Sequence, residues 1–270
     1  MPVVSVHGLY ISYHRYAATE PANAAALPLI IARGLAAPAS DWDRFAAVAR
    51  ARGPVVVYDP RGAGGSDPGP DPAQTTIADL SADLVGLLDA LGVGRAHLLG
   101  HSLGGVIALD LLLRRPERVG AAVLLSATPE PVPPEQRARA LALLARGDVA
   151  MLPPPAGGEA PRAPAPRAPD PRGWERQAAL AHALVNRPDQ TPYLEGVTVP
   201  ALILVGERES EAMQRGAELL HGWIPTSRLV RIEGAGHHAH LEQPDAFERL
   251  ALDFLDEMDA AVSGHEGGAT

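Results

Sequence analysis

Gly100-His101-Ser102-Leu103-Gly104-Gly105 is the stretch that decides the fold, because it places a serine between glycines where an apolar segment gives way to a helical pattern. Residues 96–99 form a short apolar run, and residues 106–113 form a mostly apolar helical pattern. A serine on such a sharp strand-to-helix turn adopts strained dihedral angles, and glycines two residues before and after it avoid a collision with the backbone. The spacing therefore predicts a nucleophile elbow that presents Ser102 to a substrate.

Short β-rich segments and helical patterns alternate along the rest of the chain. Most β-rich segments are continuous apolar runs, as expected of parallel strands buried on both faces. The predicted strands are residues 3–6, 10–16, 29–32, 55–59, 96–99, 121–126, 201–206 and 227–232. The predicted helices are residues 41–52, 75–91, 102–114, 210–223 and 244–258. This order predicts an α/β fold: a doubly wound, mostly parallel eight-stranded sheet with helices on both faces and a hairpin of the first two strands at one edge.

One region, residues 128–197, breaks this alternation. It contains two amphipathic helical patterns, at 135–146 and 173–186, and no strand pattern. Because it follows the sixth predicted strand, we expect a helical lid inserted into an α/β core made of residues 1–127 and 198–262.

Two segments of the chain are predicted to lack regular structure. The linker between the lid helices, at about 152–172, contains eight prolines between Pro153 and Pro171, so it cannot continue a helix or bury enough apolar area to order itself. We expect a mobile linker there and a disordered tail at 263–270.

The composition excludes several classes of protein. A chain of 270 residues with a net charge of −9 is long enough for one sizeable domain, and its charge argues against a nucleic-acid partner. No cysteine is present, so neither disulfides nor thiolate metal sites are expected, and no metal or cofactor is implied. No apolar run approaches the roughly 18 residues of a membrane span, which makes a cytoplasmic protein the expectation.

A serine nucleophile needs a base and a carboxylate that orients the base. His237 is the candidate base, because it lies in a glycine-rich loop between the last predicted strand and the last helix, where doubly wound sheets bring remote side chains together. The carboxylate is expected after the preceding strand. Composition does not separate Glu209 from Glu207 and Glu211 there, or from Glu130 after the sixth strand.

A tetrahedral intermediate also needs donors for its oxyanion. The backbone N–H of Leu103, which follows the nucleophile and opens a helix, is one candidate. The loop after the third predicted strand should supply the second donor, and the Leu35 N–H is the candidate there. Both donors belong to the backbone, so neither side chain needs to be polar.

Four motifs make the chain resemble the α/β-hydrolase superfamily, in its esterase, C–C hydrolase and epoxide-hydrolase-like branch. They are the elbow at 100–105, the Asp-x-Arg-Gly-x-Gly-x-Ser loop at 59–66, the Gly-x-x-acid turn at 206–209, and the histidine loop at 236–244. The resemblance implies a chain order of serine, acid and histidine. It also favours Glu209 as the acid, because the family places this residue three positions after the glycine.

The chain departs from the family pattern at two positions. Glu209 stands where the family usually has aspartate, and Arg33 stands before Gly34 where the family usually has histidine. Arg33 could bind a substrate carboxylate, because its planar fork suits that geometry, or it could form a structural salt bridge. His101 is a second candidate for lining the pocket and binding the substrate.

These observations together predict a serine hydrolase that cleaves an ester, thioester or lactone of a small to medium apolar acyl compound through an acyl-enzyme. A small-molecule acyl substrate is the expected partner. One alternative keeps the same residues in a non-hydrolytic or C–C-cleaving enzyme, such as an acyltransferase, lyase or cyclase of secondary metabolism. Another is an inactive, ligand-binding member.

Overall fold

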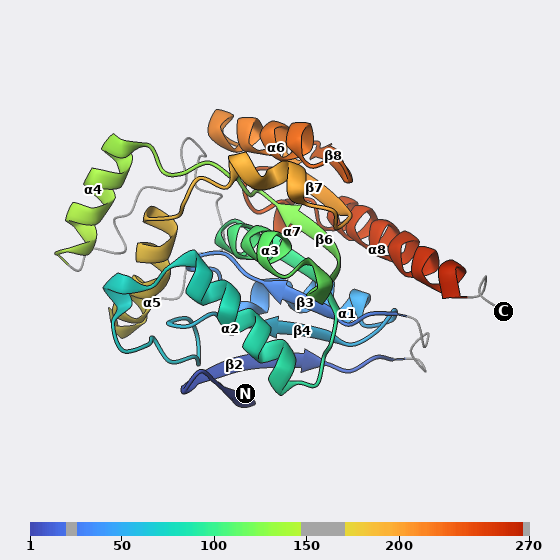
Figure 1. Cartoon of the computed structure of the whole chain (residues 1–270), viewed down its shortest axis with the longest axis horizontal. Coiled ribbons are helices and arrows are strands. Elements are labelled where there is room, and N and C mark those ends of the chain that lie inside the picture. The colour runs from blue at the N-terminus through green and yellow to red at the C-terminus, as the bar shows by residue number, and fades with distance from the viewer. Residues whose placement is uncertain (20–25, 147–170, 267–270) are drawn as a thin grey trace.

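An eight-stranded sheet runs through the molecule in the spatial order β1-β2-β4-β3-β5-β6-β7-β8 (Figure 1). The structure is a computed structural model that describes residues 1–19, 26–146 and 171–266. The strands are β1 (Val3–Val6), β2 (Leu9–Tyr16), β3 (Leu29–Ala32), β4 (Val55–Tyr58), β5 (Ala96–His101), β6 (Val119–Leu125), β7 (Ala201–Gly206) and β8 (Ser227–Ile232). From β4 across to β8 every neighbouring pair is parallel, which confirms the mostly parallel sheet.

The antiparallel hairpin of β1 and β2 lies at one edge of the sheet, as predicted. Its turn is made by His7 and Gly8, which both have positive φ angles, of 50° and 81°. Two-residue turns of this kind match the right-handed twist of the strands they join. β2 is also antiparallel to β4, so it links the hairpin to the parallel part of the sheet.

Helices cover both faces of the sheet. Their bounds are α1 (Asp43–Ala49), α2 (Ile77–Ala90), α3 (Leu103–Arg114), α4 (Pro134–Leu144), α5 (Pro171–Val185), α6 (Glu211–Trp223), α7 (Ala239–Glu242) and α8 (Pro244–Glu266). Short 3₁₀ turns are η1 (Ala39–Trp42), η2 (Pro72–Gln74), η3 (Pro116–Arg118) and η5 (Thr191–Gly196). The start of α2 shows a local reason for one boundary: the Thr76 hydroxyl accepts from the Asp79 N–H, and the Asp79 carboxylate accepts from the Thr76 N–H.

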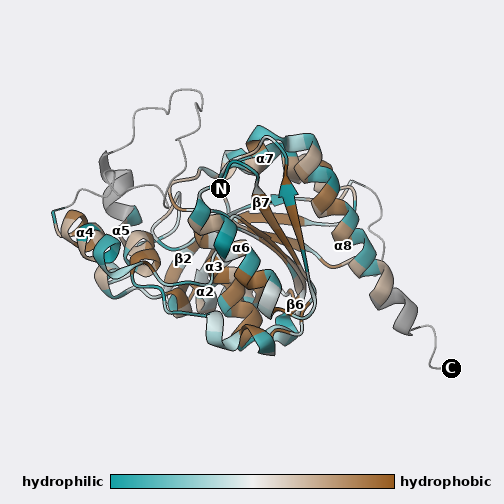
Figure 2. Cartoon of the chain, turned by 90° about the horizontal axis from the view of Figure 1, so that it is seen from above, coloured by the Kyte–Doolittle hydropathy of each residue, from teal (hydrophilic) through white to brown (hydrophobic). Residues whose placement is uncertain are grey.

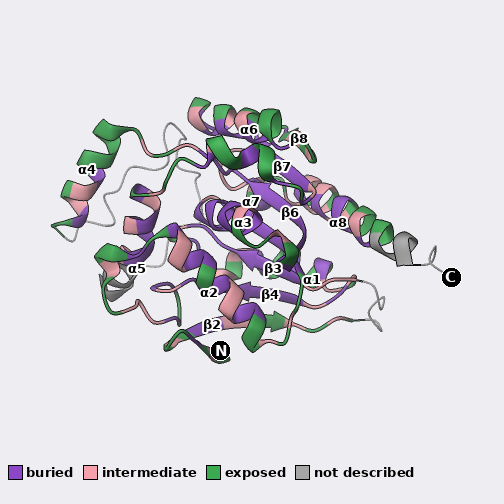
Figure 3. Ribbon diagram, in the orientation of Figure 1, coloured by how far each residue is buried: buried purple, intermediate pink, exposed green. Residues whose placement is uncertain are grey.

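Alternate residues of the strands enter two separate hydrophobic clusters. In β3, Ile30 belongs to the cluster that includes residues of α2, α3 and α6, whereas Leu29 and Ile31 belong to the cluster that includes residues of α1, α7 and α8. The central strands β3, β4 and β5 are buried along their whole length (Figure 3), and the strand β7 is coloured as hydrophobic along most of its length (Figure 2). Because successive strand residues point to opposite faces, this pattern confirms a sheet that is wound on both sides.

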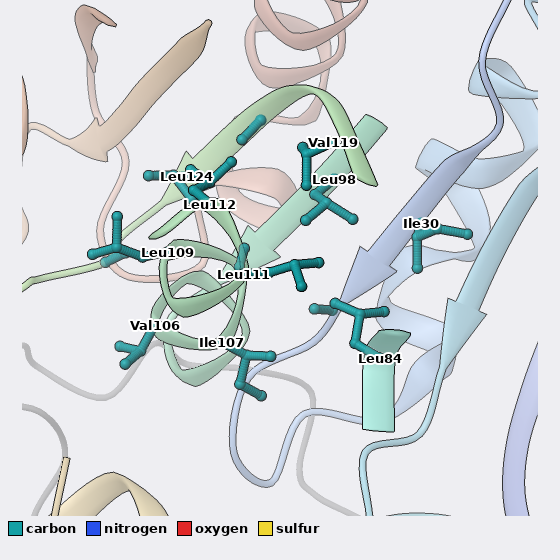
Figure 4. Packing of buried hydrophobic residues seen from close by; sticks show 14 of the residues in the cluster. Ile30, Leu84, Leu98, Val106, Ile107, Leu109, Leu111, Leu112, Val119 and Leu124 are labelled. Carbon is teal, nitrogen blue, oxygen red and sulfur yellow. The ribbon is translucent and has the colours of Figure 1, made fainter. Parts of the chain in front are cut away.

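The larger cluster fills the side of the sheet that is covered by α2 and α3. Figure 4 shows part of it, with Leu98 and Leu124 from strands, Val106 and Ile107 from α3, and Leu84 from α2. Each fully buried aliphatic side chain contributes about 1.5–3 kcal/mol to folding. This rigid support lies directly behind the start of α3, where the predicted nucleophile stands.

α4 and α5 follow β6 and pack against each other, away from the C-terminal helix (Figure 1). Their shared cluster of Ala140, Leu144, Ala181 and Val185 also receives the side chain of Leu35 from the core. The linker predicted at 152–172 lies outside the described residues up to residue 170, and α5 already begins at Pro171.

The C-terminal helix is longer than its sequence pattern predicts. α8 continues to Glu266, so the tail predicted at 263–270 is helical over its first four residues, and the rest lies outside the described residues. No proline occurs between residues 245 and 266, and so nothing in the sequence forces the helix to stop at Met258. In the described ranges, no helix is long and apolar enough to cross a membrane.

Candidate active site

Ser102 stands at the sharp turn between β5 and α3. It has φ 54° and ψ −116°, a conformation that L-residues rarely adopt, and its N–H donates to the Leu125 carbonyl of β6 at 2.9 Å. Its carbonyl accepts from the N–H groups of Gly105 and Val106, which starts α3. Strain of this kind persists only where the surrounding structure imposes it, and it commonly marks a functional residue.

The glycines around Ser102 are required by close backbone contacts. A Cβ atom on Gly104 would lie 1.9 Å from the Ala32 carbonyl oxygen, and one on Gly100 would lie 2.4 Å from the Gly104 carbonyl oxygen. A Cβ on Gly105 would lie 2.5 Å from the Cβ of Ala127. Close packing therefore requires glycine at these three positions, because the start of α3 contacts β3 and the residue Ala127 after β6 too closely for a Cβ atom there.

Glu209 and His237 meet at the carboxyl edge of the sheet. Glu209 follows β7 and His237 follows β8, and the His237 Nδ1 lies 2.7 Å from the Glu209 Oε2. The Glu209 side chain is 1% exposed and the His237 side chain is 17% exposed. Carboxylate oxygens only accept, so Nδ1 carries the ring proton and Nε2 is left with its lone pair. This is the tautomer that a general base for a serine requires.

The environment of Glu209 keeps it ionised. Burial raises the pKa of its carboxyl group, but the hydrogen bond and charge of His237, together with the Ser210 N–H, outweigh burial and lower that pKa below its ordinary value. The Ser210 N–H donates to Glu209 Oε1 at 3.1 Å, and the Ser210 hydroxyl caps α6. Both oxygens of the carboxylate thus have a partner, which holds its orientation.

Glu242 holds the loop that carries His237. Glu242 accepts from the N–H groups of Gly236 and His238, at 2.9 and 3.1 Å. Gly206, at the end of β7, allows this loop to come close, because a Cβ there would lie 2.3 Å from the Gly236 carbonyl oxygen. The position of His237 is therefore set by neighbours in the loop and by β7.

The other candidate carboxylates are engaged elsewhere. Glu207 accepts from the Gly234 N–H at 2.9 Å and supports the histidine loop from outside. Glu130 forms an exposed ion pair with Arg215 at 3.2 Å, and Glu211 is exposed in the first turn of α6. Of the carboxylates that the sequence left open, the structure brings Glu209 to the imidazole.

Ser102 and His237 belong to loops that touch. The His101 Nε2 lies 2.9 Å from the His237 carbonyl oxygen, and Ser102 is the next residue after His101. In the described part of the chain, the Ser102 hydroxyl and the His237 ring are not themselves hydrogen-bonded. Contacts between a nucleophile and its base are often long until substrate binds.

The two candidate oxyanion donors flank the serine. Leu103 is the first residue of α3, whose first N–H groups have no partner inside the helix. Leu35 lies in the loop after β3, next to Ala36 with its positive φ of 60°. A Cβ on Gly34 would lie 3.3 Å from the Cβ of Ser102, so this loop contacts the nucleophile closely.

The Arg33 side chain is buried and pairs with Asp59. Its Nε and Nη2 lie 2.9 and 2.6 Å from Asp59 Oδ1, and its Nη1 donates to the Ala37 carbonyl. Both side chains are buried, at 3% and 2% exposed. Of the two roles that the sequence left open, this geometry favours the structural salt bridge over contact with a substrate carboxylate, because no part of the fork faces solvent.

The motif around Asp59 is architectural. Gly64 has φ 48°, and a Cβ there would lie 2.1 Å from Asp59 Oδ2, while the Gly65 N–H donates to that same oxygen at 3.0 Å. The Ser66 hydroxyl donates to the Asp59 carbonyl at 2.6 Å. The conformation of this loop therefore buries Asp59, the partner of Arg33, and satisfies its hydrogen bonds.

His101 lies among other aromatic rings. It is 1% exposed, and the rings of Trp42, His237, His238 and His240 lie between 4.9 and 6.2 Å from its own. Burial lowers the pKa of His101 well below the ordinary value, and the neighbouring imidazoles lower it further. Direct contact with substrate, the role suggested for His101 by its position, is disfavoured by this enclosure.

Two residues of this region, Trp42 and His240, are not among the candidate site residues predicted from the sequence. The His240 ring stacks on Trp42 at 4.1 Å between centroids, and burial lowers its pKa to about 3. Neither residue has a local motif that separates it from an ordinary core residue. No group of three or more His, Asp or Glu side chains in the described ranges is arranged to hold a metal ion.

Comparisons with known proteins agree with this architecture. The family model described as "alpha/beta hydrolase fold" matches residues 28–156. The "Putative carbamate hydrolase RutD" of Pseudomonas savastanoi is 31% identical over 243 residues, which cover 84% of this chain and 93% of that protein. "Polyketide synthase ThaQ" of Burkholderia thailandensis is 34% identical over 229 residues, which cover 78% of this chain and 11% of the synthase.

Solved structures extend the likeness to the whole fold. The enol-lactonase from Burkholderia xenovorans LB400 is 25% identical, with a TM-score of 0.76, and the match covers 94% of this chain and all of that enzyme. Its fold and that of this chain therefore coincide over nearly their full lengths. With its parallel sheet, its serine elbow and these relatives, the chain belongs to the α/β-hydrolase family.

Proposed function

We propose that this protein is a serine hydrolase that cleaves an ester, thioester or lactone of a small to medium, largely apolar acyl compound. The observation that carries the proposal is the 2.7 Å contact between Glu209 and His237 at the same sheet edge as the strained Ser102. The three side chains come from the ends of β5, β7 and β8. Such a constellation is recognised by geometry and roles.

In the proposed mechanism, the Ser102 Oγ attacks the substrate carbonyl carbon and its proton passes to the His237 Nε2. Glu209 stabilises the imidazolium, and the N–H groups of Leu35 and Leu103 stabilise the oxyanion. His237 then gives the proton to the leaving oxygen or sulfur, which departs and leaves an acyl-enzyme on Ser102. Water, deprotonated by His237, attacks the acyl-enzyme and releases the acid.

The relatives support a hydrolase with a compact acyl substrate. An enol-lactonase shares the fold at 25% identity, which favours a cyclic or linear oxoester. The relatives named for carbamate hydrolysis add a carbamate to the acyl groups worth testing. The apolar cluster of α4 and α5, the proposed lid, packs against the side chain of Leu35 in the proposed oxyanion loop, which favours apolar acyl groups.

A fluorophosphonate probe tests the nucleophile. We expect covalent labelling of the wild-type protein and none of Ser102→Ala, with equal thermal unfolding of the two. Labelling that persists in Ser102→Ala, or folded wild-type protein that does not react, contradicts the proposal. The second result favours a ligand-binding protein without catalysis.

A substrate panel tests the reaction class. Short p-nitrophenyl esters, acyl thioesters, lactones and aryl carbamates are compared for turnover, with Ser102→Ala as the matched control. The wild-type protein should hydrolyse at least one of these substrate classes, and Ser102→Ala should hydrolyse none of them. Labelling without hydrolysis of any of them argues against a hydrolase.

Acyl transfer is the second candidate. The 34% identity to a segment of a protein named as a polyketide synthase favours it, because one fold hosts several chemistries and this relative is not named as a hydrolase. Product analysis with an acyl thioester and added alcohol or amine nucleophiles distinguishes the two reactions. Free acid as the main product supports hydrolysis, and an ester or amide as the main product supports transfer.

A further inference from the structure

His101 contacts each of the three loops that form the proposed active site. It stands directly before Ser102, and its Nε2 lies 2.9 Å from the backbone carbonyl oxygen of His237. A carbonyl oxygen only accepts, so the His101 Nε2 must carry the ring proton and donate. His101 therefore binds the backbone of His237, the proposed base, directly.

The third loop reaches the same ring. A Cβ on Gly34 would lie 3.1 Å from the His101 Nδ1 and 3.3 Å from the Ser102 Cβ, so the Gly34 backbone approaches both residues. The Leu35 N–H, a proposed oxyanion donor, follows directly. His101 thus lies between the proposed oxyanion loop, near its Nδ1, and the histidine loop, bonded to its Nε2.

The surroundings hold this ring in one orientation. His101 is 1% exposed, the Trp42 ring lies 6.2 Å from it and the His240 ring lies 4.9 Å from it. Burial and the neighbouring imidazoles keep the pKa of His101 far below its ordinary value, so the ring stays neutral and keeps its single proton on Nε2. A neutral, enclosed ring is suited to holding a loop and unsuited to exchanging protons with a substrate.

We infer that His101 is a positioning residue, which sets the separation of the Ser102 hydroxyl and the His237 ring by binding the His237 carbonyl to the elbow. The inference rests on the proposed function. The expected effect on rate comes from geometry, because a displacement of about 1 Å at a reacting group can lower the rate about 10²-fold. A ring that only fills space would not depend on its Nε2 donor.

Two amide substitutions separate these roles. The side-chain nitrogen of His101→Gln reaches about as far as Nε2, whereas that of His101→Asn stops near the position of Nδ1. The rate of fluorophosphonate labelling of Ser102, and kcat on a reactive p-nitrophenyl ester, should fall about 10²-fold in His101→Asn. Both should stay within a few-fold of wild type in His101→Gln, with KM nearly unchanged in both variants.

A second readout does not need catalysis. The downfield proton NMR signal of the His237 Nδ1–H bonded to Glu209, assigned by its loss in Glu209→Gln, should persist in His101→Gln and broaden or vanish in His101→Asn. His101→Met, which fills the volume without a donor, takes the place of Asn if that variant unfolds, and it should behave in the same way.

Equal behaviour of the donor-retaining and donor-lacking variants, in labelling rate and in the NMR signal, overturns the inference. Failure of the proposed function is a different result, namely wild-type protein that is not labelled at Ser102. The NMR comparison then still decides whether His101 positions His237.

Discussion

The Arg33 guanidinium binds the Asp59 carboxylate inside the protein, with Nη2 2.6 Å from Oδ1 and both side chains at most 3% exposed. Arg33 directly follows β3 and begins the loop that carries Leu35, the proposed oxyanion donor, and Asp59 directly follows β4. The pair therefore ties the base of this loop to the neighbouring strand. Of the two roles that the sequence left open for Arg33, this pairing favours structural support of the loop.

Removal of Arg33 should therefore destabilise the fold. Arg33→Ala leaves the Asp59 carboxylate buried and unpaired, and we expect the free energy of unfolding to fall by about 3–5 kcal/mol. Urea denaturation measures this loss. Arg215→Ala, which removes an exposed partner of Glu130, is the control and should change stability little. Unchanged stability together with a higher KM for anionic substrates alone would restore the substrate-binding role.

The identity of the acid is tested by three amide substitutions. Glu209→Gln keeps the shape of the side chain but removes the charge that stabilises the imidazolium, so kcat should fall by about 10⁴-fold. Glu207→Gln and Glu130→Gln serve as controls and should retain most of the activity, because neither carboxylate bonds to His237. Loss of activity in Glu130→Gln alone would show that the acid follows β6.

The elbow glycines should be intolerant of a single methyl group. Gly104→Ala places a Cβ 1.9 Å from the Ala32 carbonyl oxygen, a backbone atom that cannot move aside. We expect a loss of stability at the upper end of about 1–3 kcal/mol, and slower labelling of Ser102. Gly94→Ala is the matched control, because its new Cβ meets nothing within 4 Å. Equal unfolding midpoints for the two variants would contradict this packing.

Acid should weaken the contacts that tie α8 to the sheet. Asp259 bonds to His97 of β5 at 2.9 Å and pairs with Arg52. Burial raises the pKa of Asp259, but the His97 bond and the Arg52 charge outweigh burial and lower that pKa below the ordinary 3.8. A depressed carboxylate pKa contributes stability above its unfolded value, and that contribution is lost as pH falls through the folded pKa.

The substitution Asp259→Asn isolates this contribution. The difference in unfolding free energy between wild type and Asp259→Asn should be full at about pH 6 and shrink toward about pH 3, as measured by urea titrations across that range. Asp256→Asn, at the exposed end of the same Arg52 network, is the control and should show a much smaller difference. A gap between wild type and Asp259→Asn that does not change with pH would contradict the depressed pKa.

Much of this protein could be predicted from local patterns. Continuous apolar runs such as 29–32 and 201–206 mark strands with both faces buried, and these two match β3 and β7 at both ends. Glycine spacing marks the elbow, because only glycine fits where α3 starts against β3. Periodicity and steric demand act over a few residues, so the sequence alone determines the α/β class, the order of its elements and the place of Ser102.

Other features depend on the packing of distant segments. Composition left four glutamates open as the acid and the family resemblance favoured Glu209, whereas its 2.7 Å distance from His237 depends on how the loops after β7 and β8 pack together. The sequence likewise did not show whether Arg33 binds a substrate or forms a salt bridge. Arg33 and Asp59 are 26 positions apart and become neighbours only when β3 pairs with β4. Side-chain partners and burial are properties of the assembled sheet edge, and for this reason only the tertiary structure decided them.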